Sequence, residues 1–306
     1  MIRKLIATGA LALAVSAPAQ AETRVSIGTG GTGGVFYAIG AGMADILNKK
    51  LDGVTANAEV TGASVENVLR VSAGEMTIGF SSASTLYEGK QGEGTFDAAQ
   101  NVAAIAYLYP AYLQIAATTA SGVTSIEDLA DKKISVGPPG SNSAVFAERV
   151  LEASGALTPS NLSYLSYNEA TDSIKNGNLD GSIILAGVPA SAFIELTTTM
   201  DMTLVPVNGD KMGALIDKYP FYELVEIRGG VYKGADAPVA AVGDPAILFA
   251  AADADPDLIY QITKTLFDNL GDVAAVHPAA KAISLEKATK TPIPLHEGAQ
   301  RYFDGK

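Results

Sequence analysis

The sequence predicts an α/β protein of two lobes with a ligand cleft between them. Apolar, β-branched segments alternate with segments whose apolar residues recur at helical spacing, which is typical of parallel sheets covered by helices. A strand, a glycine-rich turn and a helix follow one another twice, over 24–47 and 133–153. The chain has 306 residues, of which 48% are hydrophobic, enough for one or two well-packed domains.

The first part of the chain is predicted to begin with a strand and a long helix. Val35, Ile39 and Met43 recur every four residues, which places them on one face of a helix over 35–47. Further helices are expected to begin at Ser64 and Ser125, because serine is a favoured N-cap residue. The predicted strands of this part are 24–28, 59–61, 77–80, 102–108 and 113–118.

The second part of the chain repeats this alternation. The strand 133–136 runs through the turn 137–143 into a helix over 144–153, and a later helix ends near Asn176-Gly177, a typical C-terminal signal. The remaining predicted strands are 164–166, 181–185, 239–242 and 247–249, and the remaining long helices are 257–270 and 278–284.

The N-terminus has the pattern of a secretory signal peptide. Arg3 and Lys4 precede an apolar run from Leu5 to Val15, and small residues follow at Ala19-Gln20-Ala21. We therefore expect residues 1–21 to be removed by cleavage after Ala21 and the mature protein to reach the periplasm. An uncleaved N-terminal anchor is the alternative.

Composition excludes several classes of function. Removing Arg3 and Lys4 from the 21 basic residues leaves 19 against 33 acidic ones, a net charge of −14, so nucleic acid is not an expected partner. Cysteine is absent and only two histidines are present, which argues against thiolate chemistry and zinc sites. No cofactor and no metal ion are expected, and the protein is expected to be a monomer.

The glycine-rich segment from Gly28 to Phe36 predicts an anion site. Five glycines stand between a strand and a helix, where a structural turn needs one or two. Glycine allows the backbone to approach a ligand closely, and the N-terminus of the following helix attracts negative charge. Two α/β lobes that both carry such turns favour a solute-binding protein that holds a small anion by closing its cleft.

An NAD-dependent oxidoreductase is the alternative from another class. Gly28, Gly30 and Gly33 have the spacing of the dinucleotide-binding motif. The acidic residue that this motif requires would be Glu59, which comes late in the sequence and is not expected at a strand end. Export would also separate the protein from the NAD pool, so the sequence favours a protein without enzyme activity.

Six motifs give the chain, from about Val25 to Tyr302, a family resemblance. In order they are 27–35 (IGTGGTGGV), 62–67 (GASVEN), 108–110 (LYP), 136–141 (VGPPGS), 186–189 (AGVP) and 294–299 (PLHEGA). The chain resembles the solute receptors of TRAP transporters in the TAXI branch. This resemblance implies a type II periplasmic-binding-protein fold, with 22–117 plus 226–306 as the first lobe and 118–225 as the second.

The resemblance also implies a ligand, a partner and a set of contacts. The ligand would be a small carboxylate such as glutamate, 2-oxoglutarate or a C4-dicarboxylate, and the partner would be the sodium-coupled membrane subunits of the transporter. A phosphate, phosphonate or pyrimidine-precursor receptor of an ABC importer is the alternative within this fold. The ligand contacts that the motifs imply are Gly31, Thr32, Gly33, Gly34, Ser64, Ser82, Tyr109, Ser141, Ser143 and Gly187.

Overall fold

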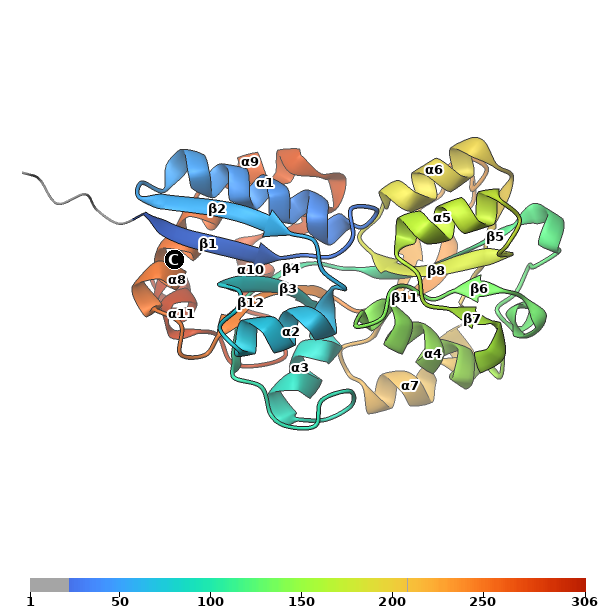
Figure 1. Ribbon diagram of the computed structural model, residues 1–306, viewed down its shortest axis with the longest axis horizontal. Coiled ribbons are helices and arrows are strands. Elements are labelled where there is room, and N and C mark those ends of the chain that lie inside the picture. The colour runs from blue at the N-terminus through green and yellow to red at the C-terminus, as the bar shows by residue number, and fades with distance from the viewer. Residues whose placement is uncertain (1–21, 208) are drawn as a thin grey trace, which may run out of the picture.

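The computed structural model describes residues 22–207 and 209–306, which form two lobes side by side (Figure 1). Each lobe is a β-sheet with helices on both faces. The predicted signal peptide, 1–21, lies outside the described residues. Within the described part of the chain, no helix is long and apolar enough to cross a membrane.

The sheet of the first lobe has five strands in the order β2-β1-β3-β12-β4. Their bounds are β1 Thr23–Gly28, β2 Val54–Glu59, β3 Ile78–Ser82, β4 Val102–Tyr109 and β12 Ala246–Ala251. β1 runs parallel to β2 and β3, whereas β12 runs antiparallel to β3 and β4. Alternate residues of β12 face the two sides of the sheet, so Leu248 joins one apolar cluster and Phe249 another.

Helices cover both faces of this first sheet. Figure 1 shows α1 and α9 on one side and α2 and α3 on the other. The bounds are α1 Val35–Lys50, α2 Ser64–Ser72, α3 Ala83–Gln91, α8 Pro256–Phe267, α9 Leu270–Val276, α10 Leu285–Ala288 and α11 Glu297–Asp304. The apolar stripe of α1, with Ile39 and Met43 almost fully buried, packs into the larger core as the sequence predicted.

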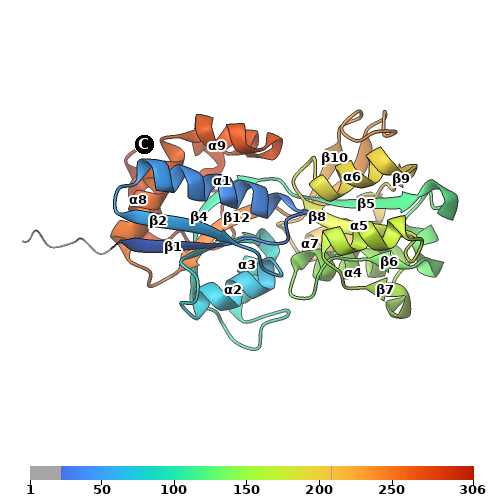
Figure 2. The same ribbon diagram turned by 45° about the horizontal axis from the view of Figure 1, so that its top comes forward.

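The sheet of the second lobe has seven strands, ordered β10-β11-β5-β8-β6-β7, with β9 also pairing with β5. The strands are β5 Tyr112–Thr118, β6 Ile134–Ser135, β7 Leu162–Ser163, β8 Gly181–Ala186, β9 Met202–Leu204, β10 Glu223–Ile227 and β11 Val239–Gly243. Figure 2 shows α5 and α6 on one side of this sheet and α4 and α7 on the other. These helices are α4 Asn142–Ser154, α5 Tyr167–Lys175, α6 Ser191–Thr199 and α7 Gly213–Lys218.

The sheets are mixed, whereas the sequence predicted parallel ones. β5 is antiparallel to β8 and to β11, because the chain enters the second lobe along β5 and leaves it along β11. Several predicted elements are also shorter than expected or of another type. The helix expected at Ser125 is a 3-10 helix over Glu127–Asp131, and the one expected at 278–284 is a 3-10 helix over Pro278–Ala282. The remaining 3-10 turns are Thr119–Ser121, Pro159–Asn161 and Gly209–Lys211.

The chain crosses between the sheets at two places. β4 ends at Tyr109 in the first sheet, and β5 begins at Tyr112 in the second. β11 ends at Gly243 in the second sheet, and β12 begins at Ala246 in the first. Sheet membership therefore favours lobe boundaries near 110–111 and 244–245, which differ from the boundaries at 117/118 and 225/226 that the sequence suggested. The first sheet thus combines strands from distant parts of the chain, β1 to β4 and β12.

Candidate functional site

A pocket lies between the lobes and has about 560 Å³ of empty volume. Residues of the first lobe form one wall and residues of the second lobe the other. The lining residues are Gly30, Gly31, Gly34, Val35, Phe36, Thr61, Ala63, Ser64 and Ser82 from the first lobe, and Pro138, Ser141, Asn142, Ser143, Ser166, Tyr167, Leu185 and Ala186 from the second.

Five helices begin at this pocket. The lining residues include the first or the N-cap residue of each helix, namely Val35 for α1, Ser64 for α2, Ser82 for α3, Ser141 for α4 and Ser166 for α5. The first N–H groups of a helix have no partner within it, and the helix dipole places partial positive charge at this end. The pocket therefore has the electrostatic character of an anion site.

The pocket wall itself is uncharged. Among the described residues that line it, none is Asp, Glu, Lys, Arg or His. Val35, Phe36, Pro138, Tyr167 and Leu185 supply apolar surface, Asn142 supplies an amide, and the other side chains are small or hydroxylated. An anion bound here would be held by N–H groups and hydroxyls, each charge-assisted hydrogen bond contributing roughly 1.5–3 kcal/mol.

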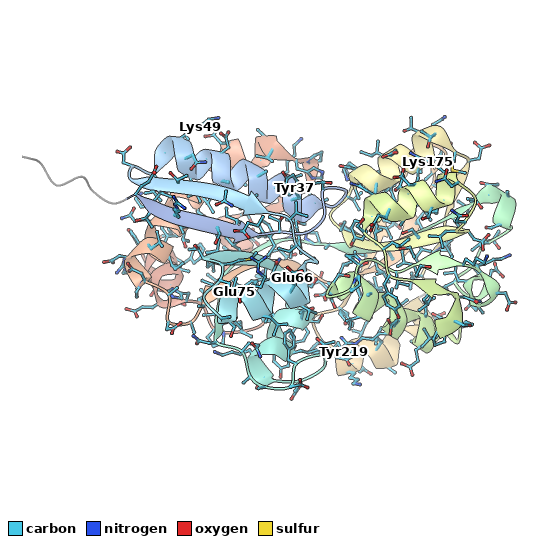
Figure 3. All side chains as sticks on the ribbon, in the orientation of Figure 1. Tyr37, Lys49, Glu66, Glu75, Lys175 and Tyr219 are labelled. Carbon is cyan, nitrogen blue, oxygen red and sulfur yellow. The ribbon has the colours of Figure 1, made fainter. Side chains whose placement is uncertain are left out.

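The lobes touch directly around the pocket, so the cleft is closed. The backbone N–H groups of Val65 and Glu66, on α2, donate to the Gly140 carbonyl of the second lobe at 3.1 and 3.3 Å. Glu66 lies at the end of α2 that faces the second lobe (Figure 3). The Asn168 amide donates to the Thr32 hydroxyl at 2.9 Å, so the glycine-rich turn is also bridged.

A second set of contacts crosses between the lobes beside α3 and α4. The Arg149 guanidinium of α4 donates to the Glu88 carboxylate of α3 at 2.8 Å and to the Tyr222 hydroxyl at 2.8 Å. The two side chains of the ion pair are only 16% and 7% exposed. The guanidinium also lies 4.3 Å from the ring centre of Tyr219, whose position is labelled in Figure 3. Arg149 is thus salt-bridged and is not among the residues that line the pocket.

Asp244 connects the lobes at the base of the cleft. Its fully buried carboxylate accepts hydrogen bonds from the Ser84 N–H at 3.1 Å, from the Ser84 hydroxyl, and from Asn142 Nδ2 at 2.7 Å. Burial raises the pKa of Asp244 to about 6, although the hydrogen bonds from Ser84 and Asn142 lower it in part. The charged form is therefore disfavoured by the fold.

The raised pKa of Asp244 predicts a pH effect on stability. A carboxyl whose pKa is higher when folded stabilises the fold below its unfolded pKa, near 4, and loses that contribution as the pH rises through 6. Relative to Asp244→Asn, the wild-type free energy of unfolding should fall by roughly 2–3 kcal/mol between pH 4 and pH 7. Denaturant titrations of both proteins across this range measure the difference, and parallel pH profiles would contradict the assignment.

The pocket brings together part of the predicted ligand contacts. Those that line it are Gly31, Gly34, Ser64, Ser82, Ser141 and Ser143. Thr32 is exposed and Gly33 is buried, and both bond to the second lobe, with the Gly33 carbonyl accepting from Ala192 N–H at 3.3 Å. Tyr109 is fully buried in the core, and its ring lies beneath Gly187, where a Cβ would lie 3.0 Å from it. These four positions are next to the pocket and do not line it.

The serine hydroxyls of the pocket are largely engaged within the protein. The Ser64 hydroxyl accepts from Ser82 N–H at 3.1 Å, and the Ser143 hydroxyl accepts from Leu185 N–H at 3.2 Å. The Ser141 hydroxyl donates to the Pro138 carbonyl at 2.7 Å and caps α4 by accepting from Ala144 N–H. The Ser141 hydroxyl therefore has no proton left for a ligand, whereas the Ser64 and Ser143 hydroxyls only accept in these bonds and can still donate, as can backbone N–H groups without a partner.

This arrangement sets an expectation for Ser141→Ala. Loss of the helix cap should lower the free energy of unfolding by about 1 kcal/mol, while ligand affinity changes little because the hydroxyl is already used. Thermal melting without ligand, followed by calorimetry with it, separates the two effects. A mutant of normal stability and weakened binding would instead place the hydroxyl on the ligand.

Among the lining residues that sequence reasoning missed are Phe36, Asn142, Ser166 and Tyr167. Ser166 and Glu169 form a capping box at the start of α5, in the pattern Ser-x-x-Glu, and this signal could have marked a further helix start in the second lobe. Asn142 and Tyr167 each directly follow an N-cap serine. Their place in the pocket depends on how the lobes meet.

The structure corrects one expectation about the dinucleotide-binding motif but does not favour a dinucleotide site. Glu59 is the last residue of β2, so it does stand at a strand end, contrary to the expectation. Its carboxylate, however, pairs with Arg70 at 3.2 Å. A Cβ on Gly33 would lie 2.4 Å from Asn168 Oδ1, so the second lobe occupies the space over the glycines that a dinucleotide would need.

Metal and histidine chemistry find no support in the described part of the chain. No group of three or more His, Asp or Glu side chains there could hold a metal ion. His277 Nδ1 accepts from Ala279 N–H and His296 Nδ1 accepts from Gly298 N–H, each at 3.1 Å at a helix start. Both histidines therefore cap the start of a helix.

Comparison with known proteins agrees with this architecture. A structure from Bordetella bronchiseptica RB50 has a TM-score of 0.55 at 16% identity, covering 92% of this chain and 89% of that one. An ancestral arginine-binding protein bound to arginine has a TM-score of 0.52 at 13% identity, covering 85% and 99%. An ABC uptake transporter substrate-binding protein from Streptococcus pneumoniae with bound histidine has a TM-score of 0.51 at 14% identity, covering 83% and 92%.

At these identities the similarity establishes the fold, and the two sheets with their cleft match the type II periplasmic-binding-protein architecture that the sequence predicted. The solved structures whose ligands are named above are binding proteins and not enzymes. The model of one family, described as NMT1-like, matches residues 27–306, nearly the whole described chain. The chain therefore belongs to the NMT1-like family.

Proposed function

We propose that this protein is an extracytoplasmic solute-binding protein that captures a small carboxylate by closure of its lobes and delivers it to the membrane subunits of a transporter. The observation that carries the proposal is the meeting of five helix N-termini in one uncharged pocket between two lobes. Such a pocket attracts an anion and, once closed, removes it from water.

The affinity that such a pocket can supply is sufficient for transport. Four to six charge-assisted hydrogen bonds of roughly 1.5–3 kcal/mol each, with a further ~0.3–1 kcal/mol from each helix dipole, reach the ~8 kcal/mol of micromolar binding after the ordering costs are met. No arginine is required. The carboxylates that the family resemblance suggests are glutamate, 2-oxoglutarate and C4-dicarboxylates.

For the transporter we propose the TRAP type, in its TAXI branch. The support is the set of six motifs, four of which supply pocket residues: 27–35, 62–67, 136–141 and 186–189. Delivery would then depend on a sodium gradient and on separate membrane subunits, with the receptor acting as a monomer in the periplasm. An ABC importer for phosphate, phosphonate or a pyrimidine precursor is the second candidate, since oxyanions suit the same helix starts.

Two measurements test this proposal. Mass spectrometry of compounds released by denaturing the purified mature protein identifies the bound solute, and calorimetry with that compound gives its affinity. We expect a small carboxylate. Release of a phosphate ester, a phosphonate or a nucleobase precursor would favour the second candidate, and uptake that follows ATP instead of sodium would exclude the TRAP type.

A further inference from the structure

We infer that the pocket selects a small hydroxy acid, with its carboxylate at the helix starts and its hydroxyl on Asn142, over the amino acid of the same shape. This inference rests on the proposed function, that the ligand is a small carboxylate, and narrows its class. Two features carry it: a buried acceptor without a partner, and the commitment of every nearby carboxylate to other groups.

The orientation of the Asn142 amide is fixed by its neighbours. Asn142 is the first residue of α4, lines the pocket and is 2% exposed. Its Nδ2 group donates to Asp244 Oδ2 at 2.7 Å and to the Ser84 hydroxyl at 3.3 Å. At pH 7, above its pKa of about 6, the Asp244 carboxyl is ionised and only accepts, so the amide nitrogen must face Asp244 and the amide oxygen must point the other way.

Asn142 Oδ1 is therefore an acceptor that needs a donor. It is buried and has no hydrogen-bond partner among residues 22–207 and 209–306. A buried polar atom of this kind is costly unless a ligand satisfies it. An ionised carboxylate cannot do so, and neither can a ketone oxygen, since both only accept. A hydroxyl can donate to Oδ1. A hydroxy acid therefore gains a hydrogen bond that a 2-oxo acid or an unsubstituted acid cannot make.

An ammonium group also donates, but it carries a charge that this pocket does not balance. The carboxylates of Asp244 and Glu169 accept hydrogen bonds from the lining residues Asn142 and Ser166, and the carboxylate of Glu66 lies on α2. Asp244 already accepts three hydrogen bonds, and Glu66 accepts from Gly62 N–H at 2.6 Å while its other oxygen lies 3.5 Å from Arg70. The helix N-termini that favour an anion disfavour a cation. A buried ammonium here would lack a counter-charge.

The test compares ligands that differ at one carbon. Calorimetry on the full mature protein uses three series: lactate, propionate, pyruvate and alanine; malate, succinate, oxaloacetate and aspartate; 2-hydroxyglutarate, glutarate, 2-oxoglutarate and glutamate, with both enantiomers where they exist. In the series that binds most tightly, we expect the hydroxy acid to exceed the unsubstituted and 2-oxo acids by about tenfold and the amino acid by about a hundredfold or more.

Each outcome of this comparison has a meaning. Tightest binding of an amino acid, or equal binding of hydroxy and unsubstituted acids, overturns the inference and leaves the carboxylate function standing. Failure of all three series to bind overturns the proposed function and the inference with it. The wild-type series needs no variant, so the inference can be tested even if mutants at this site fold poorly.

Variants then place the selectivity on Asn142. In Asn142→Ala the ratio of hydroxy-acid affinity to unsubstituted-acid affinity should fall about tenfold, to near one. Ser84→Ala is the matched control, because it removes a different donor to Asp244 and should preserve the ratio. A ratio that survives in Asn142→Ala would show that Asn142 does not carry the selectivity. A ratio that falls equally in Ser84→Ala would mean that Asn142 acts only through Asp244.

Discussion

Replacing Gly33 by valine is expected to prevent closure of the lobes and to weaken ligand binding by roughly 5- to 150-fold, the range of ~1–3 kcal/mol that overpacking typically costs. A Cβ at this position would lie 2.4 Å from Asn168 Oδ1 and 3.1 Å from Tyr167 Cβ, both on α5 of the second lobe. Since the clash exists only when the lobes meet, melting without ligand should stay near that of the wild type. Calorimetry and small-angle scattering with ligand measure affinity and closure.

Gly31→Ala is the matched control for this prediction. Gly31 also belongs to the glycine-rich turn and lines the pocket, but a Cβ there would meet no protein atom within 4 Å. A loss of affinity in Gly31→Ala with normal closure would show direct contact between the turn and the ligand. Normal closure and affinity in Gly33→Val would contradict the interlobe role given to Gly33 and return it to a purely local one.

Replacing Arg149 by alanine is expected to make the free energy of lobe closure less favourable by about 3 kcal/mol, which lowers ligand affinity roughly 150-fold. Arg149 lies in the second lobe and Glu88 in the first, so their ion pair forms only when the cleft is closed. Without Arg149, closure would bury the Glu88 carboxylate with no counter-charge, whereas the open form would leave it in water. Calorimetry should therefore detect weakened binding, with little change in the melting temperature of the ligand-free protein.

The double variant Glu88→Gln, Arg149→Met separates this effect from a loss of packing. It removes both charges and keeps side chains of similar length, so closure no longer buries an unpaired ion, and most of the affinity should return. If the double variant binds as weakly as Arg149→Ala, the contribution of Arg149 lies in its contacts with Tyr219 and Tyr222 and not in the ion pair.

The sequence determined the local units of this protein. Glycine-rich turns between strands and helices, serine N-caps and the apolar stripe of α1 are encoded within a few residues, because backbone freedom, capping and helical periodicity are short-range properties. These signals placed β1, α1 and α4 close to their observed bounds. The family resemblance proposed Gly31, Gly34, Ser64 and Ser141 as ligand contacts, and all four line the pocket. The motifs together also predicted the two-lobed fold.

Only the tertiary structure decided which strands pair and which side chains form hydrogen bonds with residues far along the chain. Strand direction and sheet membership of β5 and β11 follow from pairing with strands far along the chain, which no local pattern encodes. Which hydrogen bonds a serine hydroxyl makes likewise depends on distant groups, as the bond from Leu185 N–H to the Ser143 hydroxyl shows. Asn142 and Asp244 are 102 positions apart in the sequence, and they form their hydrogen bond only when the lobes meet. A hydrogen bond depends on the distance between two atoms in space and not on their separation in the sequence.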